Sequence, residues 1–202
     1  MRREVAATLD QAEATIALAT EHGFPHWAAM GSILGGWALA MRDRNEAGLA
    51  KLSQGIAAWR ANHASVNAPY ALAMQAEAAS LVGHIDEGFR SLDDAQAVLE
   101  EQEDRWFEAE IYRLRGELLL RQSIASEAEA ETWLRRALDV ARSQRAKSLE
   151  LRAVNSLAHL WRAQGKHSDA FDLLSRIYGW FTEGFDTIDL KYTKALLAEL
   201  RA

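Results

Sequence analysis

SLELRAVNSLAHLWRAQGKHSDAFDLLSRIYGWF, residues 148–181, is the clearest structural unit in the sequence. Each half of it repeats apolar residues three or four positions apart, which is the spacing of one face of an α-helix. These residues are Leu151, Val154, Leu157 and Trp161 in the first half, and Ala170, Leu174, Ile177 and Phe181 in the second. Gly165 separates the halves, so the stretch predicts a helical hairpin in which the small Ala158 and Ala170 let the two backbones approach. Such a hairpin cannot bury its apolar face alone and needs neighbours stacked on it.

Small residues equivalent to Ala158 and Ala170 recur upstream. The pairs are Gly36 and Gly48, Ala76 and Gly88, and Gly116 and Ala130. The second members of the four pairs are 40, 42 and 40 residues apart, and each is followed four residues later by leucine. A fixed period of this kind is typical of a solenoid. The hairpins resemble tetratricopeptide repeats, although their period exceeds the usual ~34 residues.

The sequence therefore predicts an all-α fold, a tetratricopeptide-like α-solenoid of about four helical hairpins with an extra helix at each end. We expect a single repeat domain over residues 1–202. Its repeats are expected at about 24–63, 66–103, 104–146 and 147–182, and its terminal helices at 2–20 and 187–201. Ser126 and Glu129 match a capping box, which predicts that the Ser126 side chain caps the helix that follows it.

Composition excludes several classes of function. The chain of 202 residues has a net charge of −6 and no cysteine. The negative charge disfavours nucleic acid and anionic membranes as partners, and without cysteine there is no disulfide framework or thiolate chemistry. The longest uncharged run, residues 27–41, is shorter than the ~20 residues that span a bilayer. Because the N-terminus also lacks the continuous apolar run of a signal peptide, we expect a cytoplasmic protein.

Three regions carry a resemblance to a known family. They are GFPHWAAMGSILGGWAL (23–39), RWFEAEIYRLRGELLL (105–120), and SLELRAVNSLAHLWRAQG (148–165) together with YGWFTEGFDTIDLKYTKALLAEL (178–200). They resemble the C-terminal repeat region of bacterial multidomain proteins in which a class III adenylate/guanylate cyclase domain and a signalling ATPase domain precede the repeats. The resemblance covers essentially the whole chain, and residues 178–186 are its most specific part.

The resemblance implies that the chain is the regulatory C-terminal arm of a larger signal-transduction protein. The catalytic motifs of such a parent have no counterpart here. The sequence has no G-x-x-x-x-G-K-[ST] loop to hold phosphates, and no sheet is expected to present the metal-binding aspartates of a cyclase. The helix at 2–20 corresponds to the second half of a hairpin, which suggests truncation. We therefore expect a chain that is not an enzyme.

Metal and cofactor sites are not expected either. His22 and His26 have the spacing of a helical metal pair, but Gly23 and Pro25 break the helix between them. The two imidazoles would then not converge on one ion.

The surface that we expect to bind a partner is the concave face formed by the first helix of each repeat. Its candidate residues are Met30, Ile33, Trp37, Tyr70, Glu77, Arg113, Glu117, Arg152, Asn155 and Arg162. The apolar half suits a partner helix or a neighbouring subunit, and the arginines suit a carboxylate or phosphate. Glu110, Arg113, Glu117 and Arg121 are also spaced to form ion pairs with one another, which is the interpretation that we favour.

Three functions remain open. The first is a protein-interaction module that receives a partner protein or the neighbouring domains of a larger chain. The second is a sensor that binds a small-molecule effector in the groove. The third is a structural spacer or homodimerisation element, in which the helix at 2–20 pairs with its copy in a second chain.

Overall fold

The computed structural model describes residues 3–62, 67–101 and 105–201, with the side chain of residue 124 left out. Across these residues the chain forms ten α-helices and one 3₁₀ helix, and no strand. The predicted all-α fold is confirmed. The expected boundaries at 2, 63, 66, 103 and 104 lie outside the described residues.

The chain divides into two compact units, Glu4–Arg105 (the N-terminal unit) and Trp106–Ala202 (the C-terminal unit), and Arg3 groups with the latter. The N-terminal unit contains α1 (Val5–Glu21), α2 (Pro25–Asp43), α3 (Glu46–Ala61), α4 (Ala68–Val82) and α5 (Ile85–Glu101). The C-terminal unit contains α6 (Glu108–Gln122), the 3₁₀ helix η1 (Ile124–Ser126), α7 (Glu127–Ser143), α8 (Lys147–Ala163), α9 (His167–Tyr178) and α10 (Ile188–Glu199). That the repeats form a single domain stays a prediction.

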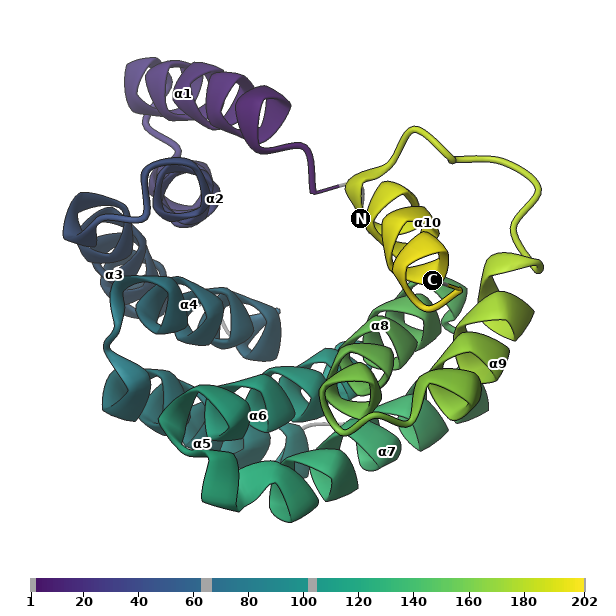
Figure 1. Cartoon of the computed structure of the whole chain (residues 1–202). Coiled ribbons are helices and arrows are strands. Elements are labelled where there is room, and N and C mark those ends of the chain that lie inside the picture. Colours follow the sequence, from purple (N-terminus) through teal and green to yellow (C-terminus); the bar gives the residue numbers. More distant parts are fainter. Residues whose placement is uncertain (1–2, 63–66, 102–104, 202) are drawn as a thin grey trace. The chain divides into compact units, whose positions relative to one another are not determined.

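In the N-terminal unit, helices that follow one another in the sequence pack side by side. α2 contacts α1 and α3, and α4 contacts α2, α3 and α5 (Figure 1). Ile33, Leu52 and Trp59 are almost completely buried in the core of this unit. Burial of side chains of this size contributes roughly 1.5–3 kcal/mol each relative to exposure.

Glycines set the close approach of α2 to α3. A Cβ atom added at Gly36 would lie 2.7 Å from the Cα of Leu52, and one added at Gly48 would lie 2.7 Å from the Cα of Ala40. Both distances are shorter than a carbon–carbon contact allows. The two small residues that define the first repeat are therefore the points where the helix backbones meet.

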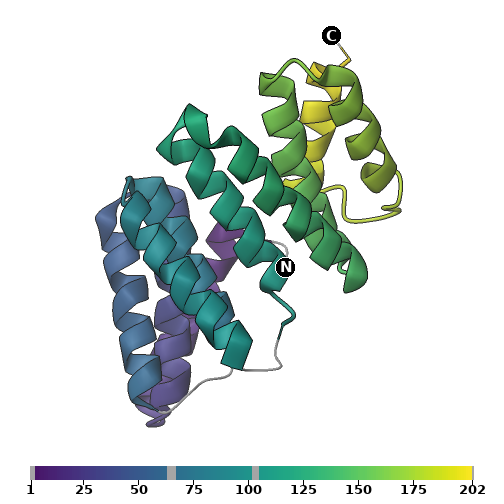
Figure 2. The same ribbon diagram turned by 90° about the horizontal axis from the view of Figure 1, so that it is seen from below.

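In the C-terminal unit, α7 packs against both α6 and α8, and α9 packs against α8 (Figure 2). α6 also contacts α8, and α10 lies against α8 and α9. Leu134, Leu157 and Leu174 have no exposed surface and form part of the core. α8 is therefore in contact with both α6 and α10.

Whether a side chain caps a helix depends on the backbone conformation at the N-cap residue as well as on the sequence motif. Asn45 has an extended backbone, and its side chain accepts a hydrogen bond from the Gly48 amide at 3.2 Å. The predicted capping box at Ser126 is wrong, because Ser126 makes no side-chain cap hydrogen bond. Its φ of −90° and ψ of 5° belong to η1, whereas a capping side chain needs the extended backbone of an N-cap.

The uncharged run at residues 27–41 lies within α2, whose buried residues include Ile33, Trp37 and Ala38. No helix in the described part of the chain is both long and apolar enough to cross a membrane.

Candidate functional site

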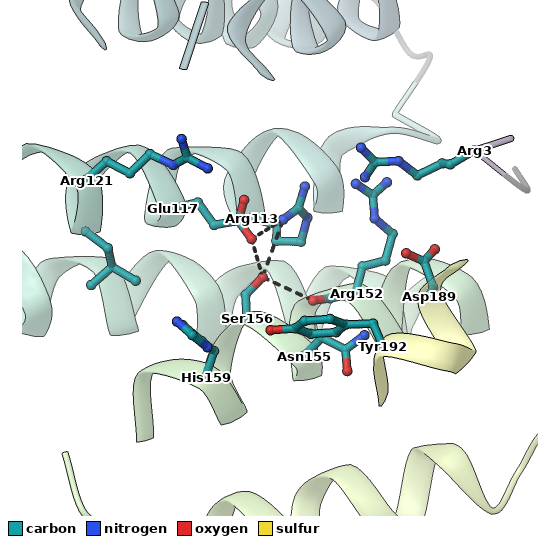
Figure 3. A pocket seen from close by; sticks show the side chains of 11 residues that line it. Arg3, Arg113, Glu117, Arg121, Arg152, Asn155, Ser156, His159, Asp189 and Tyr192 are labelled. Carbon is teal, nitrogen blue, oxygen red and sulfur yellow. Dashed lines mark hydrogen bonds and ion pairs between the residues drawn. The ribbon is translucent and has the colours of Figure 1, made fainter. Parts of the chain in front are cut away.

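A cluster of polar side chains lies between α6 and α8 in the C-terminal unit. Glu110, Arg113 and Glu117 are three or four residues apart and therefore share one face of α6. Arg152 and Ser156 have the same relation on α8. Figure 3 shows the side chains of Arg113, Glu117 and Ser156 pointing toward one another.

Glu110 is the buried centre of this cluster, with 2% of its surface exposed. Its carboxylate accepts hydrogen bonds from Arg113 Nε at 3.0 Å and Nη2 at 2.5 Å, and Arg152 Nη2 lies 2.6 Å from Oε1. Burial alone would raise the pKa of Glu110, but the charges of Arg113 and Arg152 outweigh it and lower the pKa to about 2. The group is therefore an anion at every ordinary pH.

Glu117 extends the cluster toward solvent. It forms an ion pair with Arg113 and accepts a hydrogen bond from the Ser156 hydroxyl at 2.7 Å. Burial raises the pKa of this carboxyl, but the charge of Arg113 and the Ser156 hydrogen bond lower it by more. The pKa of Glu117 therefore lies below its ordinary value. The predicted ion pairs of Arg113 with Glu110 and Glu117 are thus confirmed, and the predicted pairing of Arg121 stays a prediction.

α10 adds the third side of the site. Thr193 has no exposed surface, and its hydroxyl lies within hydrogen-bond distance of two acceptors, Asn155 Oδ1 at 3.0 Å and the Asp189 carbonyl oxygen at 2.7 Å. Asp189 and Tyr192 of the same helix also line the cavity described next. The pKa of Tyr192 is raised by burial of its hydroxyl.

A cavity of about 410 Å³ opens over this network. Its lining combines buried groups with exposed groups such as Arg121 and His159. The residues are Arg3, Arg113, Glu117, Leu120, Arg121, Arg152, Asn155, Ser156, His159, Asp189 and Tyr192. Arginines outnumber carboxylates in this lining, which favours an anionic or zwitterionic group.

The structure brings together four of the candidate residues, Arg113, Glu117, Arg152 and Asn155, in this cavity. Arg162 lies on α8, as Arg152 and Asn155 do, but it forms an ion pair with Glu199 and does not line the cavity. The spacing along α8 predicted that Arg152, Asn155 and Arg162 share one face of the helix. The partner of Arg162, Glu199, comes from α10, which lies outside the repeat period.

The other five candidate residues lie in the N-terminal unit. The Trp37 indole donates a hydrogen bond to Glu77 Oε2 at 2.9 Å, which joins α2 to α4. Met30 and Tyr70 are partly buried against the core of this unit. Ile33 requires a correction, because it has no exposed surface. It packs where Gly55 of α3 approaches α2, so it belongs to the core and not to an exposed face.

Ser156, Asp189, Tyr192 and Thr193 are site residues that the sequence did not single out. Ser156 follows the predicted Asn155 on α8, and a full helical-wheel count would have included it, since Arg152 lies four residues earlier. The three residues on α10 come from a helix outside the repeat period, so periodicity gave no signal for them.

No group of three or more metal-ligating side chains is found in the described part of the chain. A scan against protein-family models and a search of the curated proteins find no match to this sequence.

Proposed function

We propose that the chain is a non-catalytic protein-interaction and regulatory module with a tetratricopeptide-like α-solenoid arrangement. The hairpin order of the helices, the 40- to 42-residue period and the close contact at Gly36 and Gly48 support this arrangement. The resemblance to repeat regions of cyclase-linked signalling ATPases supports a role as the C-terminal, sensory arm of a larger bacterial protein.

The observation that carries the proposal is the buried ionic network at Glu110. Replacing a buried ion pair by apolar residues of similar volume is often neutral or stabilising, so stability alone is a weak reason for such a network. The network does hold Arg113, Arg152 and Glu117 in fixed positions beside an open cavity. Groups fixed in this way lose little conformational freedom when a partner binds.

A partner protein that presents a carboxylate, such as an acidic side chain or a chain end, matches this cavity. Guanidinium groups bind carboxylates through charge-assisted hydrogen bonds. His159 and Arg121 are exposed and line the same cavity. The chain would then bind the partner through charge and hydrogen bonds, without catalysing a reaction.

The test is quantitative affinity capture from a lysate of the source cells, followed by native mass spectrometry of the captured complex. The first variant combines Arg121→Ala with His159→Ala, which removes two exposed groups at the cavity. The matched control combines Arg176→Ala with His167→Ala, both exposed on α9 and away from the cavity lining. We expect a protein that the wild type and the control retain and the first variant loses by at least tenfold. Equal capture by all three chains contradicts the proposal.

The second candidate function is a sensor for a small anionic effector, favoured by the cavity volume of about 410 Å³ and its arginine-rich lining. A ligand at 100 times its dissociation constant stabilises the folded chain by about 2.7 kcal/mol. Thermal unfolding with a panel of dicarboxylates, sugar phosphates and nucleotides checks this candidate. A compound that raises the unfolding temperature of the wild type but not of the Arg121→Ala, His159→Ala variant supports it, and a flat panel leaves the protein partner.

A further inference from the structure

A second cavity lies in the C-terminal unit, where the connector between α9 and α10 passes the start of α8. Its volume is about 790 Å³. Apolar side chains from α8, the connector and α10 line it, namely Leu151, Trp180, Phe181 and Leu190. We name it the connector groove.

Its charged lining is entirely acidic. Glu183, Asp186 and Asp189 line the groove, and no lysine, arginine or histidine is among its described lining residues. Lys147 lies nearby and does not line the groove; its ammonium is 2.7 Å from Glu150 Oε2, and Glu150 also pairs with Arg142. The groove is therefore apolar at its base and negative along its lining.

Trp180 already shows what kind of group suits this place. It is 56% exposed, and the Lys147 ammonium lies 5.5 Å from the centre of its ring. A cation at this distance from an indole is attracted by the negative face of the ring. The ring also contacts Phe181 edge to face, with centroids 5.1 Å apart, which fixes its position without covering it.

Exposed apolar groups continue beside the groove. Phe185, between two lining residues, is 44% exposed, and Ile188 at the start of α10 is 51% exposed. Large apolar side chains exposed close together on a soluble protein indicate an interaction surface. This exposed apolar surface is larger than one side chain could cover, so it suits a peptide segment of a partner.

We propose that the connector groove binds a basic, leucine-rich peptide segment of a partner protein. Apolar side chains of the segment pack on Trp180 and Phe181, over the buried Leu151 and Leu190. Arginine or lysine side chains of the segment pair with Glu183 and Asp189. Charge complementarity selects this occupant, since an acidic segment would meet the carboxylates of Glu183 and Asp189. The groove shares Asp189 with the α6–α8 cavity, but its other lining residues differ. The proposal does not depend on the function proposed for that cavity.

The probe is a capped hexapeptide of alternating leucine and arginine, added to the isotope-labelled full chain and followed by NMR. The matched peptides replace arginine by neutral citrulline or by glutamate. We expect submillimolar binding that shifts the Gly184 amide and the Trp180 indole signals. The citrulline peptide should bind at least tenfold more weakly, and 0.5 M salt should weaken the arginine peptide, because it screens exposed charges.

Two variants with matched controls locate the site. Trp180→Ala should weaken binding about tenfold, whereas Trp27→Ala, a tryptophan of equal exposure in the N-terminal unit, should leave it unchanged. Glu183→Gln should weaken it two- to fivefold, and Glu129→Gln, an exposed carboxylate on α7, should not. Unchanged thermal unfolding of Trp180→Ala excludes a folding defect.

Several outcomes overturn the proposal. These are no binding at 2 mM peptide, equal binding of the citrulline peptide, and shifts that map away from residues 180–190. A dimer in sedimentation that Trp180→Ala dissociates would show that a second copy of the chain occupies the groove, which also overturns it. Because Arg121→Ala with His159→Ala should leave peptide binding intact, failure here is distinct from failure of the function proposed above.

Discussion

At the scale of single residues, the energetics of the candidate site depend on Glu110. Its buried carboxylate compensates two buried guanidinium groups, those of Arg113 and Arg152. Removing one member of a buried ion pair leaves uncompensated charge and costs roughly 3–5 kcal/mol. We therefore expect Glu110→Ala to lower the free energy of unfolding by that amount in urea denaturation. Glu129→Ala, at an exposed position of α7, should change it by less than about 0.5 kcal/mol. A small effect at Glu110 would mean that the arginines find other partners.

The same carboxylate predicts a dependence of stability on pH. The pKa of Glu110 falls from an ordinary value of 4.5 to about 2 in the folded chain, so the unfolded chain binds more protons between these values. The stabilisation is fully present above pH 5, amounts to about 3 kcal/mol, and is lost as the pH falls toward 2. Denaturant midpoints measured from pH 7 to pH 2 check it. Glu110→Gln should flatten the profile, and a profile of equal slope in the variant would contradict this origin.

Gly36 and Gly35 are adjacent in α2 but meet different neighbours. A Cβ at Gly36 would lie 2.7 Å from the Leu52 Cα, whereas one at Gly35 would lie 3.2 Å from the Ala12 Cβ and 3.5 Å from the end of the flexible Lys51. Gly36→Ala must force α2 and α3 apart, and we expect a loss of about 1–3 kcal/mol or more. Gly35→Ala gains helix propensity of about 1 kcal/mol, which should offset its milder crowding. Thermal unfolding of both variants checks the order, and equal losses would contradict it.

At the scale of secondary-structure elements, the sequence predicted the helices well. The two helices expected on either side of Gly165 are α8 and α9, and the terminal helix expected at 187–201 is α10 (Ile188–Glu199). Apolar spacing, glycine and proline act locally, so one sequence is enough to read them. The Ser126 cap failed for the same reason, because the motif ignores the 3₁₀ turn that precedes α7.

The candidate site was only partly predictable. Arg113 and Glu117 share a helix face by spacing alone, and their pairing followed. Ser156 lies 39 residues from Glu117, and Thr193 lies 38 residues from Asn155. Contacts over such separations depend on how α6, α8 and α10 pack, and the repeat period contains no information on α10. Ile33 was misplaced because its helix is buried on more than one face, which a single stripe of apolar residues does not reveal.

A buried hydrogen bond between Thr193 of α10 and Asn155 of α8 connects the two helices. We predict that this bond stabilises α10. Thr193→Val keeps the side-chain volume but removes the hydroxyl that lies 3.0 Å from Asn155 Oδ1 and 2.7 Å from the Asp189 carbonyl oxygen. Leaving a buried acceptor unsatisfied costs about 1–3 kcal/mol. We expect faster hydrogen exchange in α10. Thr132→Val is the control, because its exposed hydroxyl bonds only to a carbonyl of its own helix. Equal exchange in the two variants would show that apolar packing alone holds α10.

At the scale of the whole molecule, each unit has its own buried core. Leu52 and Trp59 belong to the N-terminal unit, and Leu134 and Leu174 belong to the C-terminal unit. In repeat proteins stability is a sum of local terms and interfaces between neighbours, so a local defect need not spread through the chain. The cores therefore set how far the effect of a substitution extends.

Hydrogen exchange of two variants tests this for the full chain. Gly36→Ala disturbs the contact of α2 with α3, and Glu110→Ala disturbs the contact of α6 with α8. We expect the first to raise exchange in α1–α4 and leave α6–α10 unchanged, and the second to do the reverse, because local opening is confined to cooperative units. Gly35→Ala and Glu129→Ala serve as the matched controls. If either variant raised exchange throughout the chain, all the helices would unfold together, which would contradict the independence of the two cores.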